Sequence, residues 1–175
     1  MRKLVLTFGI IAGIINTILM RSFQPLYMQD GQMDMGKGEL LGYISMIVAL
    51  SMIFFGVKSY RDKHQEGIIS FGKAFKVGFF ITLVASVIYV TGWMIYYNTD
   101  ETAQQFPEQY LEYMIDELKA EGASEEKIAE ERAEFQSQME LYKIHAVMIA
   151  ATFMEILPVG LIISLFSALI LKRKE

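Results

Sequence analysis

The sequence contains no cysteine. This absence excludes disulfide bonds, thiolate metal sites and a cysteine nucleophile. Of its two histidines, His64 and His145, neither has a second histidine at metal-ligand spacing, so zinc chemistry is not expected. No G-x-S-x-G motif, paired carboxylates or nucleotide-binding motif occurs in a usable context. We therefore predict a protein that is not an enzyme and has no catalytic residue, no metal and no cofactor.

The sequence also lacks a strong charge of either sign. Its net charge is −4, from 16 basic and 20 acidic residues, while 53% of the chain is hydrophobic and the mean hydropathy is +0.33. The high hydrophobic content is compatible with 36 charged residues because the charges are gathered into blocks between apolar runs, as a bilayer requires. The net charge averages over two different sides of a membrane, so no nucleic-acid partner is expected.

Four apolar runs are long enough for helices that cross a bilayer, which need roughly 20 residues each. They cover about 4–23, 40–57, 74–97 and 146–171. The sequence therefore predicts an all-α, polytopic membrane protein, with residues 1–175 as a single membrane domain in contact with lipid. The first run resembles a signal peptide, but it is long for one and no small-x-small cleavage site follows.

Local signals refine the spans. Gly9 and Gly13 form a GxxxG motif, which allows close approach of another helix, although glycine is also common in spans without that role. Ser70 is placed to cap the helix of the third span. An aromatic belt of the kind found at membrane interfaces marks the far end of that span, at Trp93, Tyr96 and Tyr97.

Residues 98–143 form the long polar segment between the third and fourth spans. Apolar residues recur there at helical spacing, which predicts two amphipathic helices. Pro107 suits the first turn of the first helix, Gly122 its end, and Ser124 the cap of the second. The second helix either ends before the fourth span or continues into it. A disordered acidic linker is the alternative. The apolar stripe of the second helix comprises Ile128, Phe135, Met139 and Tyr142.

The cations indicate the orientation in the membrane. One side carries ten of the 16 basic residues and only three acids: Arg2, Lys3, Lys58, Arg61, Lys63, Lys73, Lys76, Lys172, Arg173 and Lys174, with Asp62, Glu66 and Glu175. The other side carries six basic residues and sixteen acids. Because cytoplasmic loops are enriched in Lys and Arg, both termini are predicted to be cytoplasmic and 98–143 extracytoplasmic.

Glu155 is the acid that interrupts an apolar run, and such a residue is a candidate functional group. At 1.5 Å per residue it lies roughly 24 Å along its helix from the cytoplasmic end, close to the depth of Arg21 at about 25 Å and beyond Asn16 at about 18 Å. Pro158 frees the carbonyl of Met154 and loosens the helix nearby. The residues Glu155, Arg21, Asn16 and Pro158 thus form a candidate intramembrane polar site.

Three interpretations of Glu155 remain open. It pairs with Arg21, or hydrogen-bonds between helices in its protonated form. It couples the transport of protons or other ions. Alternatively, it is a residue at the headgroup level without a special role.

Three segments carry a family resemblance: MIVALSMIFFGVKSYRDK (46–63), GIISFGKAFKVG (67–78) and VGLIISLFSALILKRK (159–174). They resemble the bacterial membrane proteins grouped as domain of unknown function 4199, and the likeness spans nearly the whole chain. The resemblance implies a four-span protein of a bacterial envelope. It implies no activity, substrate or site residue.

Together these observations predict a multi-pass protein of the bacterial inner (cytoplasmic) membrane. Its function is predicted to be a non-enzymatic structural or interaction component of the envelope, associating with itself or with other envelope proteins. The alternative is a small transporter or channel component that works as an oligomer and uses Glu155.

Overall fold

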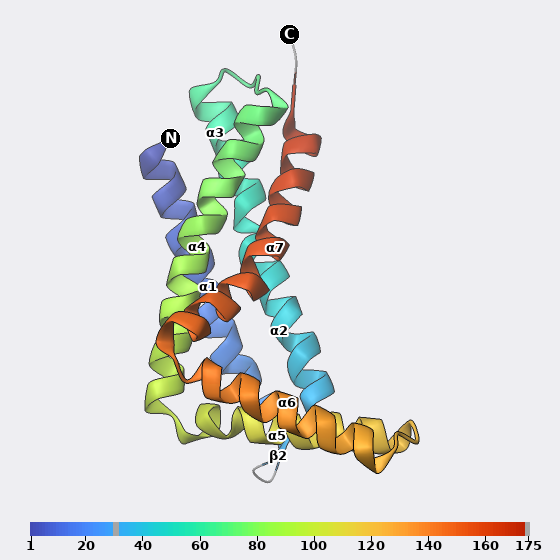
Figure 1. Cartoon of the computed structure of the whole chain (residues 1–175). Helices are drawn as coiled ribbons and strands as arrows, with labels where there is room; N and C mark the ends of the chain where they lie inside the picture. Colours follow the sequence, from blue (N-terminus) through green and yellow to red (C-terminus); the bar gives the residue numbers. More distant parts are fainter. Residues whose placement is uncertain (30–31, 174–175) are drawn as a thin grey trace.

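The computed structural model describes residues 1–29 and 32–173 (Figure 1). Within them the backbone is almost entirely helical, with one short antiparallel pair of strands. Lys174 and Glu175, which belong to the predicted cytoplasmic tail, lie outside the described residues. The elements are α1 (Arg2–Tyr27), β1 (Met28–Gln29), β2 (Gln32–Met33), α2 (Met35–Leu50), α3 (Met52–His64), α4 (Phe71–Thr99), α5 (Glu101–Ala120), α6 (Glu125–Tyr142) and α7 (His145–Leu171).

Four helical segments of the described chain are long and apolar enough to cross a membrane. They are Arg2–Tyr27, Met35–His64, Phe71–Thr99 and His145–Leu171. The all-α class with four transmembrane helices is therefore confirmed, and the chain is an integral membrane protein. Many large apolar side chains on the outer faces of these helices are exposed, as expected for helices that contact lipid rather than water.

The second span consists of α2 and α3, which meet at Ser51. The Ser51 backbone is still helical (φ −57°, ψ −22°), and its amide donates to the carbonyl of Ile47. Its hydroxyl donates to the carbonyl of Val48 at 2.6 Å. Hydrogen bonds of this kind from Ser to a preceding carbonyl bend helices, so the span is one helix with a local irregularity.

The helix α4 is the centre of the bundle. It makes extensive contacts with both α1 and α7, whereas α1 and α7 make almost none with each other. The remaining span, α2 and α3, completes the bundle against α1, α4 and α7. Because α1 and α7 lie on different sides of α4, residues at equal depth on these two helices are not neighbours.

Glycines bring α1 close to α4, as the GxxxG motif predicted. A Cβ added at Gly9 would lie 2.5 Å from Cβ of Val84, and one added at Gly13 would lie 2.5 Å from Cβ of Ile88. Real Cβ atoms do not approach other atoms this closely. The two glycines are therefore required for the distance between the helices, and the prediction is confirmed.

The contact between α4 and α7 is equally close and more polar. A Cβ at Gly160 would lie 2.2 Å from Cγ2 of Thr82, and one at Gly78 would lie 2.9 Å from Oγ of Ser164. The hydroxyls of Thr82 and Ser164 are hydrogen-bonded across the interface at 3.1 Å, and both residues are fully buried. Small residues and an interhelical hydrogen bond are the usual means of helix association in lipid.

The helices α5 and α6 form a hairpin that lies across one end of the bundle, whereas the start of α1 and the end of α7 lie at the opposite end (Figure 1). Gly122 at the turn has φ +79°, a conformation that glycine adopts without strain, and the Ser124 side chain accepts from the amide of Lys127. The stop, the cap and the helical pair that the sequence predicted are thus present. The predicted stripe of Ile128, Phe135, Met139 and Tyr142 is half-buried within an otherwise mostly exposed helix.

One detail of the hairpin differs from the sequence prediction, and another decides between two alternatives that the sequence left open. The helix α5 begins at Glu101, capped by the Asp100 side chain, so Pro107 lies inside it rather than in its first turn. An aspartate cap satisfies the free amides of the first turn, and here it moves the start of the helix ahead of the proline. The second helix does not continue into the fourth span, because α6 ends at Tyr142 and α7 begins at His145.

Candidate functional site

Glu155 lies on α7 with its side chain exposed on the surface of the bundle. No hydrogen bond or ion pair joins it to another residue among those that the structure describes. Its neighbour Met154 is 69% exposed, and Ile162 and Phe166 on the same helix are also exposed. The residue is therefore an ionisable group on an otherwise apolar outer face of a span.

Pro158 lies one turn beyond Glu155 inside α7. Proline has no amide hydrogen, so the carbonyl of Met154 lacks its normal helical donor. The helix changes direction along its length, and its first half crosses α4 while its second half runs along the bundle (Figure 1). The loosening of α7 that Pro158 predicts therefore lies next to the exposed carboxyl of Glu155.

Two phenols lie within electrostatic range of Glu155, that of Tyr89 in α4 and that of Tyr142 at the end of α6. The Tyr142 hydroxyl accepts a hydrogen bond of 2.8 Å from Nε1 of Trp93. Burial raises the pKa of Tyr142, the Glu155 carboxylate raises it further, and hydrogen bonds to Thr152 and Trp93 oppose the shift. The Tyr142 phenol is thus held neutral, as a hydrogen-bonding group at the base of the hairpin.

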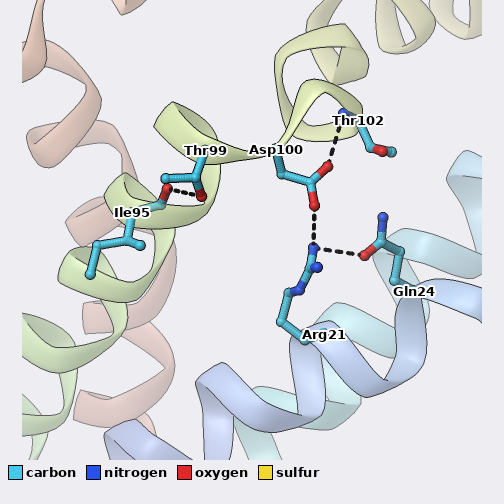
Figure 2. Close-up of polar contacts among 6 residues, drawn as sticks. All are labelled: Arg21, Gln24, Ile95, Thr99, Asp100 and Thr102. Carbon is cyan, nitrogen blue, oxygen red and sulfur yellow. Dashed lines mark hydrogen bonds and ion pairs between the residues drawn. The ribbon is translucent and has the colours of Figure 1, made fainter.

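Arg21 does not pair with Glu155. Its Nη1 donates to Oδ2 of Asp100 at 3.0 Å and to Oε1 of Gln24 at 2.9 Å (Figure 2). Its guanidinium carbon also lies 4.3 Å above the ring of Tyr96. The predicted pairing with Glu155 is therefore wrong. Equal depth suggested it, but α4 separates the two helices that carry these residues.

Asp100 is the partner that the sequence did not suggest. Its Oδ1 accepts from the amide of Thr102 at 3.0 Å, so the same carboxylate caps α5 and binds Arg21 (Figure 2). Partial loss of water opposes ionisation, but the hydrogen bonds from Thr102 and Arg21 outweigh it and hold the pKa of Asp100 below its usual value. The one available signal was its position as a cap residue between the third span and a helical segment.

Asn16 lies fully buried within the bundle. Its Oδ1 accepts a hydrogen bond from Oγ of Ser45 in α2 at 3.1 Å, and this bond links the first two spans. The Ser45 hydroxyl has a single hydrogen and also lies 2.7 Å from the carbonyl of Gly42. The same contact is therefore satisfied when the Asn16 amide is turned so that Nδ2 donates to Ser45. The buried hydroxyl of Ser86 in α4 has no partner among the described residues, which is unusual in a folded protein.

The four predicted residues therefore do not form one site. Asn16 lies inside the bundle, Arg21 lies at the hairpin end with Asp100, and Glu155 and Pro158 lie together on the outer face of α7. Within 1–29 and 32–173, no three residues among His, Cys, Asp and Glu gather as a metal site would require. An exposed carboxyl of this kind can bind a proton or a partner group.

Comparison with known proteins gives one match. The model of a family described as protein of unknown function (DUF4199) matches residues 7–173. No curated protein and no solved structure matches the chain. The match covers most of the first span, the other three spans and the hairpin between the third and fourth.

Proposed function

Since the chain belongs to the DUF4199 family of proteins of unknown function, we propose its role from its geometry: it is a non-enzymatic interaction component of a membrane that binds a further transmembrane helix through the outer face of α7. The observation that carries this proposal is the position of Glu155. The carboxyl is exposed within a span and has no partner among the described residues.

The cost of that position supports the proposal. A charged side chain at the centre of a span costs about 2.5 to 3.5 kcal/mol, and such residues almost always face another helix or a polar cavity. Among the described residues, Glu155 lies near the phenols of Tyr89 and Tyr142 but forms a hydrogen bond with neither. A second helix against α7 would cover the carboxyl together with the exposed Met154 and Ile162.

A second copy of the chain is the simplest partner. A two-fold contact brings the same face of both copies together, and two carboxyls placed side by side share a proton rather than both ionise. Another protein of the same membrane is the alternative partner, provided that it presents a donor to Glu155.

We further propose the bacterial inner membrane as the location, with both termini cytoplasmic and the α5–α6 hairpin outside. The cation-rich segments support this orientation because the start of α1, the end of α3, the start of α4 and the end of α7 lie at one end of the bundle (Figure 1). The backbone amide of Arg173 donates to the carbonyl of Ile69 at 3.0 Å, which joins two of these segments. Alkaline phosphatase activity from a fusion in the 65–70 loop would overturn the orientation.

The natural absence of cysteine allows a direct test of the α7 contact. Met154→Cys and Ile162→Cys place a single thiol on the proposed face, and Val87→Cys places one on an exposed position of α4, where the side chain is 52% exposed. In native membranes treated with a mild oxidant or a bifunctional thiol reagent, we expect dimers of the α7 variants and none of the control. Equal cross-linking at all three positions would contradict a specific contact.

A second candidate function, a transporter or channel component, is favoured by the polar side chains of Asn16 and Ser86, which are fully buried among the spans. Four spans bury few polar groups, so a pathway would have to form in an oligomer with Glu155 as its coupling group. Reconstituted vesicles that contain a pH-sensitive dye test this candidate. A proton flux that Glu155→Gln abolishes would support it, whereas a stable detergent-purified monomer without flux would exclude it.

A further inference from the structure

At the end of the bundle where α1 begins and α3 ends, residues of both helices line a shallow, open cleft of about 490 Å³. Its rim carries the basic side chains of Arg2 and Lys3 from α1 and of Lys63 and His64 from α3. No acidic residue lines it. The two helices thus contribute cationic groups to one concave surface.

The basic side chains of this rim are free to bind an anion. Arg2, Lys3 and Lys63 are exposed, and none of them forms an ion pair with another described residue. Two other cations at this end of the bundle already have partners: Arg61 pairs with Asp62 at 2.6 Å, and Lys73 donates to Gln65 at 2.6 Å. The positive charge of the cleft is therefore uncompensated within the described chain.

The cleft is apolar on its inner side. Leu4 and Phe8 of α1 line it, and both are half-buried against the hydrophobic core of the bundle. These residues belong to the first span, so they lie where acyl chains begin, while Arg2 and Lys3, which immediately precede Leu4, carry their charges to the level of the headgroups. A ligand that fits both parts has an anionic head and an apolar tail.

We propose that this cleft is a binding site for an anionic phospholipid. The phosphate contacts the basic side chains of α1 and α3, and an acyl chain lies along Leu4 and Phe8. Free inorganic phosphate shares the anionic chemistry, but it would leave the apolar wall unoccupied. The site lies at one end of the bundle, away from Glu155, so the proposal does not depend on the association of α7.

The charge rule for membrane topology does not explain the cleft. That rule requires an excess of Lys and Arg on the cytoplasmic side, and it is met equally by cations at any position there. Lys58 and Lys172 are exposed cations at the same end of the bundle, but neither lines the cleft. They therefore provide a matched control with the same loss of charge.

The test compares Lys3→Ala/Lys63→Ala with Lys58→Ala/Lys172→Ala in the purified full-length chain. Native mass spectrometry measures the binding of dioleoyl phosphatidylglycerol and of dioleoyl phosphatidylcholine from detergent. We expect the wild-type protein and the control to prefer phosphatidylglycerol, and the cleft variant to bind it roughly thirtyfold more weakly, the change expected for two lysines that each face an anionic headgroup. Inorganic phosphate should not displace the lipid.

Three results would overturn the proposal. The wild-type protein shows no preference for phosphatidylglycerol, both double variants lose the same affinity, or inorganic phosphate displaces the lipid at low millimolar concentration. The last result would assign the cleft to a free anion. If the alanine variant aggregates, Lys3→Gln/Lys63→Gln removes the same charges with longer polar side chains, and the same three outcomes apply.

Discussion

Arg21 and Asp100 are 79 positions apart in the sequence, yet their side chains form an ion pair of 3.0 Å. The pair joins the far end of α1 to the junction between α4 and α5, where the Asp100 carboxylate also caps the hairpin (Figure 2). One side chain thus fixes where the third span stops and how the hairpin leaves it.

Substitutions at this junction should separate its two roles. Arg21→Ala and Asp100→Asn each remove the ion pair. The Arg21 side chain is 47% exposed and that of Asp100 is 26% exposed, so we expect the pair to contribute about 0.2 to 1 kcal/mol to stability. Asp100→Ala also removes the cap and should cost about 1 kcal/mol more. The free energy of unfolding in mixed detergent and dodecyl sulfate measures these effects. A larger loss for Asp100→Asn than for Asp100→Ala would contradict the assignment of the cap.

The same carboxylate predicts a pH dependence. The pKa of Asp100 is lower in the folded protein than in the unfolded chain, so the unfolded state takes up the proton first as the pH falls. The stabilisation is complete above the unfolded pKa, near 3.9, and is lost as the pH falls through the folded value. Melting curves between about pH 6 and pH 3 should show this loss, and Asp100→Asn should show a smaller one.

The close contact between α4 and α7 can be tested by comparing an alanine substitution at this contact with one elsewhere in the bundle. Gly160→Ala places a methyl group 2.2 Å from Cγ2 of Thr82, so we expect a loss of about 1 to 3 kcal/mol from overpacking. Gly42→Ala is the same change in α2, where an added Cβ meets no atom within 4 Å, and it should be neutral or stabilising by up to about 1 kcal/mol. Thr82→Ser, which removes the clashing methyl, should partly rescue Gly160→Ala. Equal effects at the two glycines would refute the close contact.

Glu155→Leu should weaken the association of α7 with its partner without lowering the stability of the monomer. Because the carboxyl has no partner among the described residues, its replacement by an apolar side chain should leave the melting temperature of the detergent-solubilised monomer unchanged or raised. The same variant should lose the cross-link at Met154→Cys. Destabilisation of the monomer by more than about 1 kcal/mol would show that Glu155 acts within its own chain; Met154→Leu is the matched control.

Trp93 is the only tryptophan in the sequence and reports on the base of the hairpin. Tyr142→Phe removes the acceptor of its indole N–H, so we expect a blue shift of the fluorescence emission and a loss of about 0.5 to 1.5 kcal/mol. Tyr110→Phe is the control, since the Tyr110 ring packs against Phe106 and Phe135 while its hydroxyl has no hydrogen bond within the described residues. An unchanged spectrum for Tyr142→Phe would show that the hydrogen bond does not form in solution.

Several local features of the fold could be predicted because they depend on neighbouring residues. Ser70 and Ser124 cap their helices, Gly122 adopts a positive φ at the turn, and the Gly9–Gly13 motif lies at a close contact. The start of α5 could not be placed in the same way. Pro107 and Asp100 both resemble helix starts, and the choice between them depends on the ion pair with Arg21.

The sequence by itself determined the four spans and the helical hairpin, because the length, apolarity and capping of each segment are properties of consecutive residues. Only the tertiary structure decided which polar side chains meet. Depth along a helix follows from counting residues, but the choice of neighbour depends on the order in which the helices pack and on their rotation. With α4 between α1 and α7, Arg21 binds Asp100, Asn16 binds Ser45, and Glu155 is left on the outer face.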